Sequence, residues 1–333
     1  MVFMLVAADA FAAPKPTATQ RPQTPTPTLR PYTPTSTPTK TPTATPRPTP
    51  TATAPAGISL AIIEPMSGAS IDSDRVNVRG TFSGPVNTGI IVNDRVAYAQ
   101  GGRFALNELP LVAGSNTIDV VMTTVDGTTT RRSVAVTASG NPPPMRVVAD
   151  VASGFAPLSV TFSYVRSSTQ PVTKFAIDFD GDGHDDFSTR KSPPASIQNT
   201  YTTPALYKAT LTLLDAAGVT TKSDVSILVE TQTARDDVFT TLWDSMNTAL
   251  AQQNVSGALS CLNVAAQQRY APVFTELLPY MPTIIASYSV PQRVSATRDM
   301  LEYAVNRTID GVDSIFLVYA LLDGDGVWRL DSM

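Results

Sequence analysis

Between residues 57 and 231 the chain consists of short runs in which apolar and polar residues alternate, with turn residues between the runs. A period of two is typical of a strand with one buried face, whereas a helix repeats about every 3.6 residues. Many short strands divided by Gly, Asn, Asp and Pro indicate β-sandwiches. From residue 234 apolar residues recur at helical spacing, namely at Phe239, Leu242, Trp243, Met246 and Leu250. The sequence therefore predicts a multidomain protein, with two all-β sandwiches followed by an α+β domain.

The first 13 residues resemble the end of a secretion signal. A short apolar run over residues 2–8 precedes Ala10-Phe11-Ala12, which is an A-x-A cleavage pattern. The run is too short to cross a membrane, because a crossing takes about 20 apolar residues. We therefore expect a partial signal peptide at residues 1–13, no transmembrane span, and a secreted or cell-surface, extracellular protein.

About two-thirds of residues 14–56 are Thr or Pro. Such a segment has no apolar face to bury and few backbone donors for a helix or a sheet. It is predicted to be a disordered Thr/Pro-rich linker, of a kind that is often O-glycosylated. It either holds the folded modules away from a surface or is a plain tail, and the sequence leaves both readings open.

Residues 57–140 open with Glu64-Pro65-Met66-Ser67-Gly68 and continue with Val78-Arg79-Gly80 and Val92-Asn93. Strand-like runs are expected at 59–63, 76–80, 89–93, 116–121 and 134–136. On these motifs the segment resembles a bacterial immunoglobulin-like (Ig-like) β-sandwich. The resemblance implies a spacer or a binding module.

Residues 145–231 contain an acidic loop, which reads Ile177-Asp178-Phe179-Asp180-Gly181-Asp182-Gly183-His184-Asp185-Asp186. Gly154-Phe155-Ala156-Pro157 precedes the loop and Asn199-Thr200-Tyr201 follows it. In this order the motifs resemble the PKD (polycystic-kidney-disease) repeat, a small β-sandwich of secreted bacterial proteins. Members of that family often have Trp where this chain has Ile177, so an aromatic contact to a polymer is not expected there.

The acidic loop also has the residue types of a calcium site. Asp178, Asp180 and Asp182 fit positions one, three and five of an EF-hand-like loop, and His184 would offer its backbone carbonyl at position seven. The twelfth position is Thr189, where a bidentate Glu would be expected. The alternative is a polar hairpin turn without a metal. The predicted ligands of a weak, structural Ca²⁺ site are Asp178, Asp180, Asp182, His184 and Asp186.

Residues 234–333 begin with helices and end with strand-like runs at 300–308, 314–322 and 327–333. Shorter helices are expected to start at Ser256 and near Pro272, and Asp323-Gly324-Asp325-Gly326 indicates a tight hairpin. This order resembles the SnoaL-like and ketosteroid-isomerase-like cone superfamily, which implies a curved sheet wrapped around helices and a pocket. Because both faces of residues 314–322 are apolar, we expect that strand to be buried on both sides.

The composition argues against several kinds of site. Cys261 is the only cysteine, so no disulfide forms within the chain, and we expect it to be buried. His184 is the only histidine, which removes most zinc sites and Ser-His-Asp triads. A net charge of −4 gives no indication of nucleic-acid binding. No catalytic residue is predicted and the ligand-binding residues are unknown, while Arg329 and Asp331 share one strand face and are expected to pair.

These observations predict a non-catalytic, extracellular or cell-surface, modular binding or adhesion protein. Its sandwiches would act as spacers or bind carbohydrate or protein, so the expected partner is a polysaccharide or a surface protein and not a nucleic acid. A dimer through residues 234–333 is a further expectation. The alternatives are an enzyme with an active-site pocket in residues 234–333 and a purely structural surface component.

Overall fold

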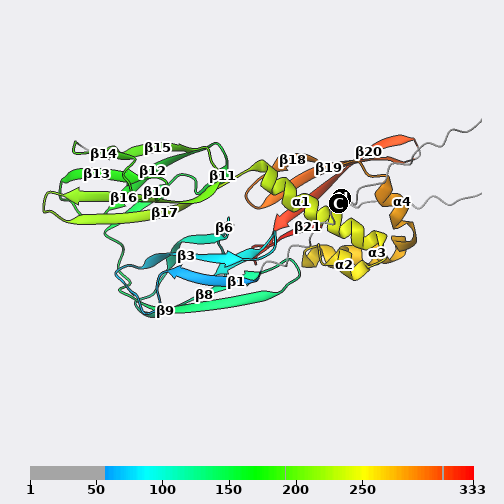
Figure 1. The fold of residues 1–333 in the computed structure, drawn as a ribbon, viewed down its shortest axis with the longest axis horizontal. Coiled ribbons are helices and arrows are strands. Elements are labelled where there is room, and N and C mark those ends of the chain that lie inside the picture. The colour runs from blue at the N-terminus through cyan, green and yellow to red at the C-terminus, as the bar shows by residue number, and fades with distance from the viewer. Residues whose placement is uncertain (1–56, 192, 310) are drawn as a thin grey trace, which may run out of the picture. The chain divides into compact units, whose positions relative to one another are not determined.

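The computed structural model describes residues 57–191, 193–309 and 311–333 (Figure 1). The predicted signal peptide at 1–13 and the predicted linker at 14–56 lie outside the described residues. Within the described part, five sheets and a group of helices surround three clusters of buried apolar residues. Among the described helices, none combines the length and the apolar character that a membrane crossing requires. The limits of the predicted domains themselves stay predictions.

The first cluster is enclosed by the two sheets of a β-sandwich. One sheet has the order β1-β3-β7-β6 and the other the order β2-β9-β8-β4-β5. The strands are β1 Ser59–Glu64, β2 Ser70–Ile71, β3 Arg75–Ser83, β4 Gly89–Val92, β5 Arg95–Val96, β6 Tyr98–Gln100, β7 Arg103–Pro110, β8 Gly114–Thr123 and β9 Thr129–Ala138. The space between the sheets is filled by large, almost completely buried side chains, among them Ile90, Phe104, Ile118 and Met122.

The strands predicted over residues 57–140 are confirmed as β1, β3, β4, β8 and β9. The sequence does not predict β2, β5, β6 and β7. Of these, β2 and β5 have only two residues each and β6 has three. In β7, Glu108 has a positive φ of 53° and the pairing with β3 shifts register between Val76 and Val78. Such a bulge moves the following side chains to the other face and hides the alternation.

The second cluster lies between a three-stranded sheet, β10-β12-β15, and a five-stranded sheet, β11-β17-β16-β13-β14. The strands are β10 Met145–Ala149, β11 Ser153–Phe155, β12 Leu158–Arg166, β13 Val172–Asp178, β14 Phe187–Thr189, β15 Ser196–Tyr201, β16 Ala205–Asp215 and β17 Thr220–Glu230. Its largest fully buried side chains include Phe162, Phe175, Ile177, Leu211 and Ile227. Ile177 belongs to this core, and the expectation about a polymer contact at that position stays a prediction.

The C-terminal part packs helices against one antiparallel sheet of order β18-β19-β20-β21 (Figure 1). The elements are α1 Gln232–Ala251, α2 Val255–Leu259, α3 Val264–Leu277, η1 Leu278–Tyr280, α4 Met281–Ala286, β18 Gln292–Ala296, β19 Met300–Ile309, β20 Val312–Leu322 and β21 Trp328–Ser332. The apolar stripe of α1 forms the third cluster together with the sheet, and the Phe239 ring stacks on Tyr303 with 3.6 Å between centroids. Cys261 is buried there, as expected.

Two predicted helix starts are wrong. α2 begins before Ser256, because the side chain of Asn254 caps it by accepting the N–H of Gly257 at 2.8 Å. α3 begins well before Pro272, because Asn263 caps it in the same way through the N–H of Ala266. Both helices thus use Asn at the position where a short polar side chain satisfies a free backbone donor.

The expectation that residues 314–322 are buried on both sides is also wrong. Ile315 is 70% exposed and Leu317 is 38% exposed, whereas Val318 and Ala320 on the opposite face are buried. On β20, Val318 and Ala320 are the buried residues that share a core with the helices, and the partly buried Leu322 packs against it. β20 therefore presents apolar side chains to the outside of the sheet.

The turn at residues 323–326 lies directly against β4 of the first sandwich. A Cβ added at Gly89 would stand 2.3 Å from the carbonyl oxygen of Asp325 and 2.7 Å from the backbone nitrogen of Val327. Real Cβ atoms do not approach backbone this closely, so only glycine fits at this position.

We predict that Gly89→Ala lowers the free energy of unfolding by about 1–3 kcal/mol, because the added methyl group meets backbone atoms that cannot turn away. Urea denaturation measures the loss. Gly324→Ala is the matched control, since a Cβ there meets nothing within 4 Å. Both Gly-to-Ala changes lower the conformational entropy of the unfolded chain to the same extent, so that effect cancels in the comparison. Equal stability of the two variants would contradict the close approach of β4 and the turn.

Candidate functional site

The acidic loop connects β13, which ends at Asp178, to β14. Asp178 is 8% exposed, and its two carboxylate oxygens accept the backbone N–H groups of Gly181 at 2.7 Å and of Gly183 at 3.0 Å. Both glycines have positive φ values, 82° and 92°, in the left-handed region that glycine adopts without strain. The two backbone hydrogen bonds to the Asp178 carboxylate therefore fix the conformation of residues 178–183.

The structure brings three of the five predicted calcium ligands together. One carboxylate oxygen from each of Asp178, Asp180 and Asp186 lies within 4.8 Å of the others. Asp182 and His184 are exposed and lie outside this group, and the Asp182 carboxylate accepts the backbone N–H of His184 at 2.7 Å. Converging carboxylates are the donors that Ca²⁺ prefers, and each oxygen keeps a lone pair beyond its backbone hydrogen bond. The donor set fits one divalent cation, and the ligand roles of Asp182 and His184 stay predictions.

Tyr201 of β15 holds the loop through a hydrogen bond to its backbone. It is not among the predicted site residues. Its hydroxyl donates to the carbonyl oxygen of Phe179 at 2.9 Å, and the side chain is almost completely buried. Burial raises the pKa of Tyr201, so the hydroxyl keeps its proton and donates. Its place in Asn199-Thr200-Tyr201, one of the PKD-like motifs, is the sequence signal that could have found it.

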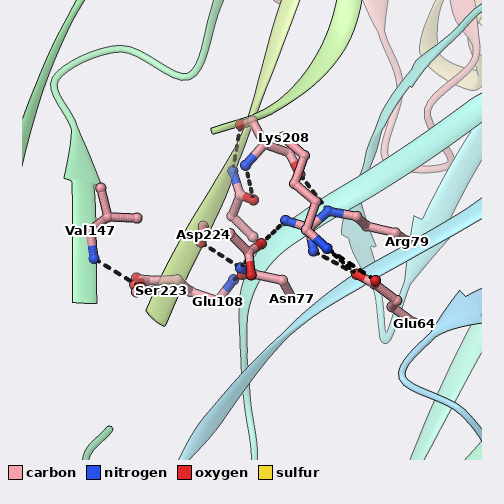
Figure 2. A network of polar contacts seen from close by, with 10 residues as sticks. Glu64, Asn77, Arg79, Glu108, Val147, Lys208, Ser223 and Asp224 are labelled. Atoms are coloured by element: carbon pink, nitrogen blue, oxygen red, sulfur yellow. Dashed lines mark hydrogen bonds and ion pairs between the residues drawn. The ribbon is translucent and has the colours of Figure 1, made fainter. Parts of the chain in front are cut away.

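A second polar constellation joins the first sandwich to the second, and Figure 2 shows Arg79 of β3 near its centre. The Arg79 side chain is only 14% exposed, and its Nη1 donates to Glu64 Oε2 at 2.9 Å. Its Nε donates to the Ser226 hydroxyl at 3.0 Å, and its Nη2 pairs with the Asp224 carboxylate. Lys208 of β16 reaches the same Glu64 carboxylate, with Nζ 3.0 Å from Oε1. One guanidinium thus connects β1 and β3 of the first sandwich to β17 of the second.

Two asparagines of the first sandwich extend this contact. Asn77 Nδ2 donates to the carbonyl oxygen of Asp224 at 2.7 Å. The Asn107 amide donates to the Ser226 carbonyl and accepts the Ser226 N–H, both at 2.9 Å, as a neighbouring strand would. The partners stand 147 and 119 positions apart in the chain, so no local sequence pattern indicates them.

The constellation also shifts the protonation of Glu64. Burial alone would raise the pKa of this carboxyl, but the hydrogen bonds and charges of Lys208 and Arg79 hold the pKa below its usual value. The charged form of Glu64 is therefore the form that the contact stabilises.

The C-terminal part is fixed to the first sandwich through Asn87. Its Nδ2 donates to the carbonyl oxygen of Trp328 and its Oδ1 accepts the Trp328 N–H, each at 2.8 Å. The predicted pair of Arg329 and Asp331 does not form. Arg329 pairs with carboxylates of the 323–326 turn, which folds back beside β21, and Asp331 accepts from the side chain of Asn263 at 2.8 Å.

The enzyme alternative would need a pocket in residues 234–333 with an acid of raised pKa. A hollow of about 610 Å³ lies against the start of α3 and the 323–326 turn. Burial would raise the pKa of Asp325 there, but the hydrogen bond from Arg329 leaves it below its usual value. A general acid that works near neutral pH needs the opposite shift. Asp325 therefore gives the enzyme alternative no support.

No protein-family model matches the chain, and no curated protein matches it either. Solved structures with similarity include the fibronectin(III)-like modules of Clostridium thermocellum CbhA, at 14% identity over 53% of this chain and 96% of that chain, with a TM-score of 0.21. Another is the Bacteroides ovatus mixed-linkage glucan utilization locus SGBP-B in complex with a mixed-linkage heptasaccharide, at 17% identity over 54% and 48%, with a TM-score of 0.19. A third is dimeric latent PorU from Porphyromonas gingivalis, at 12% identity over 54% and 20%, with a TM-score of 0.30.

The chain thus spans less than half of the SGBP-B and PorU chains. Scores this low carry no argument about this protein. The description of its sheets as sandwiches rests on its own strand pairing and buried residues.

We predict that Arg79→Ala lowers the free energy of unfolding by about 2 kcal/mol, because two carboxylates in a partly buried contact lose their common partner. Arg131→Ala is the control, since Arg131 is 66% exposed in its pair with Asp119 and its loss is expected to cost under about 1 kcal/mol. Urea denaturation compares them.

The same substitution should weaken the acid dependence of stability. The lowered pKa of Glu64 means that its contribution is present above the ordinary value of about 4.3 and is lost as pH falls through the folded value. The wild-type chain should therefore lose more stability below about pH 4 than Arg79→Ala does. Parallel curves for the two chains would show that Arg79 does not act through this carboxyl.

Proposed function

We propose that the chain is a non-catalytic, extracellular or cell-surface, modular binding or adhesion protein. The observation that carries the proposal is the Arg79 contact between the two sandwiches. Modules in one chain move relative to each other by default, unless their interface holds them. A mostly buried guanidinium shared between carboxylates of both modules opposes that motion, which suits a protein that presents a binding surface.

A polysaccharide is the partner that the exposed chemistry favours. A hollow of about 330 Å³ lies beside the contact, and its polar lining includes Arg75, Asn77, Arg146 and Ser223. Sugar hydroxyls both donate and accept, so they can bond with such side chains and with the carboxylate of Glu108 in the same lining. A surface protein is the second candidate of the same proposal.

The Ca²⁺ site is a structural element of this proposal. The convergence of Asp178, Asp180 and Asp186 supports it, and the PKD resemblance of residues 145–231 stays a proposal as well. A bound cation would offset the repulsion between these carboxylates and hold β13 and β14 together. Its role would be stability and not catalysis.

The outer face of β20 supports association of the C-terminal part. Ile315 and Leu317 expose apolar surface that a second copy of the chain would cover. A dimer through this face, and the cone-like resemblance of residues 234–333, belong to the proposal. A purely structural surface component is the alternative if no ligand is found.

The test is retention of the full chain on insoluble glucan, chitin and bacterial cell walls, with the walls used before and after protease treatment. Retention that survives the protease is the expected result and indicates a polysaccharide. Retention that the protease abolishes would move the proposal to a surface protein, and no retention would favour the structural alternative. Release of soluble sugar would contradict a non-catalytic role, and sedimentation of the same samples reports the dimer.

For the metal, we predict that about 10 mM Ca²⁺ raises the free energy of unfolding by about 1–3 kcal/mol, given dissociation constants of about 0.1–1 mM for extracellular sites, and that EDTA removes the gain. Asp180→Asn should abolish the response, because it removes one charge while keeping the acceptor for the Asp182 N–H. Asp237→Asn, exposed on α1, is the control and should keep it. If Ca²⁺ does not change the unfolding curve of the wild-type chain, the metal site is contradicted and the loop is a polar turn.

A further inference from the structure

A small hollow of about 250 Å³ lies where β4 to β6, the end of β17 and the start of α1 meet the β20–β21 hairpin. A second hollow of about 200 Å³ shares Leu228, Glu230, Arg235 and Arg298 with it. Their walls are mostly apolar, with a few polar side chains. Concave space of this kind, where modules meet, is the usual form of a small-ligand site.

Arg235, in the first turn of α1, is a charged wall residue that is 9% exposed. Its Nη2 donates to Glu230 Oε2 at 2.5 Å, and its guanidinium carbon lies 4.6 Å from the centroid of the Trp328 ring. Its Nε has no hydrogen-bond partner among the described residues. A buried N–H without an acceptor is unfavourable, and because Arg235 lines both hollows, an acceptor atom of a ligand there would satisfy it.

Within the described part of the chain, Gln100 in β6 has the complementary unsatisfied group, an acceptor without a donor. Its side-chain Oε1 is buried and has no donor among the described residues. The last torsion of a Gln side chain is soft, so the amide can turn toward the hollow at little cost. This wall of the hollow therefore lacks a donor.

Arg298 lies at the exposed rim and lines both hollows. Its guanidinium carbon stands 4.9 Å from the centroid of the Tyr98 ring, and within the described ranges no carboxylate forms an ion pair with it. The lining therefore holds two positive charges, from Arg235 and Arg298, and one negative charge, from Glu230. The hollow thus carries one positive charge without a counter-ion.

We propose that this junction binds a small monocarboxylate with an apolar body and a hydroxyl group. The carboxylate pairs with Arg298 at the rim, and the apolar body lies against the wall that includes Tyr98 and Trp328. The hydroxyl donates to Gln100 Oε1 and accepts from the Nε–H of Arg235. A space of about 250 Å³ equals the bulk of roughly eight water molecules, which fits a single-ring or branched hydroxy acid and not a polymer. The inference goes beyond the surface role proposed above and does not depend on it.

The experiment titrates 4-hydroxyphenylacetate and 2-hydroxy-4-methylpentanoate into the full chain and follows tryptophan fluorescence. Trp328 lines the hollow, and Trp243 is the only other tryptophan. We expect a saturable change with at least one of the two acids. The uncharged amide of that acid should bind about tenfold more weakly, because it loses a charge-assisted hydrogen bond.

Two variants locate the binding. Arg298→Gln should weaken the acid about tenfold and leave the amide unchanged, whereas Arg132→Gln, exposed on β9, should change neither. Ala234→Leu places a larger side chain in the wall from an exposed helix position and should block both compounds. The proposal is overturned if neither acid gives a saturable change up to about 10 mM, if acid and amide bind alike, or if Arg298→Gln has no effect.

Discussion

The charge of Arg79 is the constraint on which the arrangement of the two sandwiches depends. A guanidinium that is 14% exposed has to be paired, because a buried charge without partners is strongly unfavourable. Its partners are Glu64 of the first sandwich and Asp224 of the second, so both modules have to offer their carboxylates at the same place. The side chains of Asn77 and Asn107 add hydrogen bonds to β17 at the same place.

The attachment of the C-terminal part follows from a short covalent connection. Only Thr231 separates β17 from α1, and its side chain caps the helix by accepting the N–H of Ala234. Glu230 and Arg235 pair across this junction, and Asn87 ties β21 to the first sandwich. The two small hollows lie at this junction, where side chains of both sandwiches and of the C-terminal part meet.

Sequence periodicity predicted the elements whose side chains obey a regular period. It failed where a local feature broke that period, as the positive φ of Glu108 does in β7. It also failed where apolar residues serve different environments, since Ile315 and Val318 look alike in the sequence but only Val318 faces the helices. In the acidic loop the spacing pointed to Asp178, Asp180 and Asp186, whose carboxylates converge, but spacing alone could not tell that Asp182 turns toward the N–H of His184.

The sequence by itself determined what depends on neighbouring residues. It determined the change from strands to helices near residue 234, the turn at 323–326, and the acidic loop, whose Asp178 bonds reach only three and five positions ahead. Tertiary structure alone decided the partners of Arg79, the enclosure of Arg235 and the exposed face of β20. Those depend on which surfaces meet, and a contact between residues 145 positions apart leaves no pattern in a single sequence.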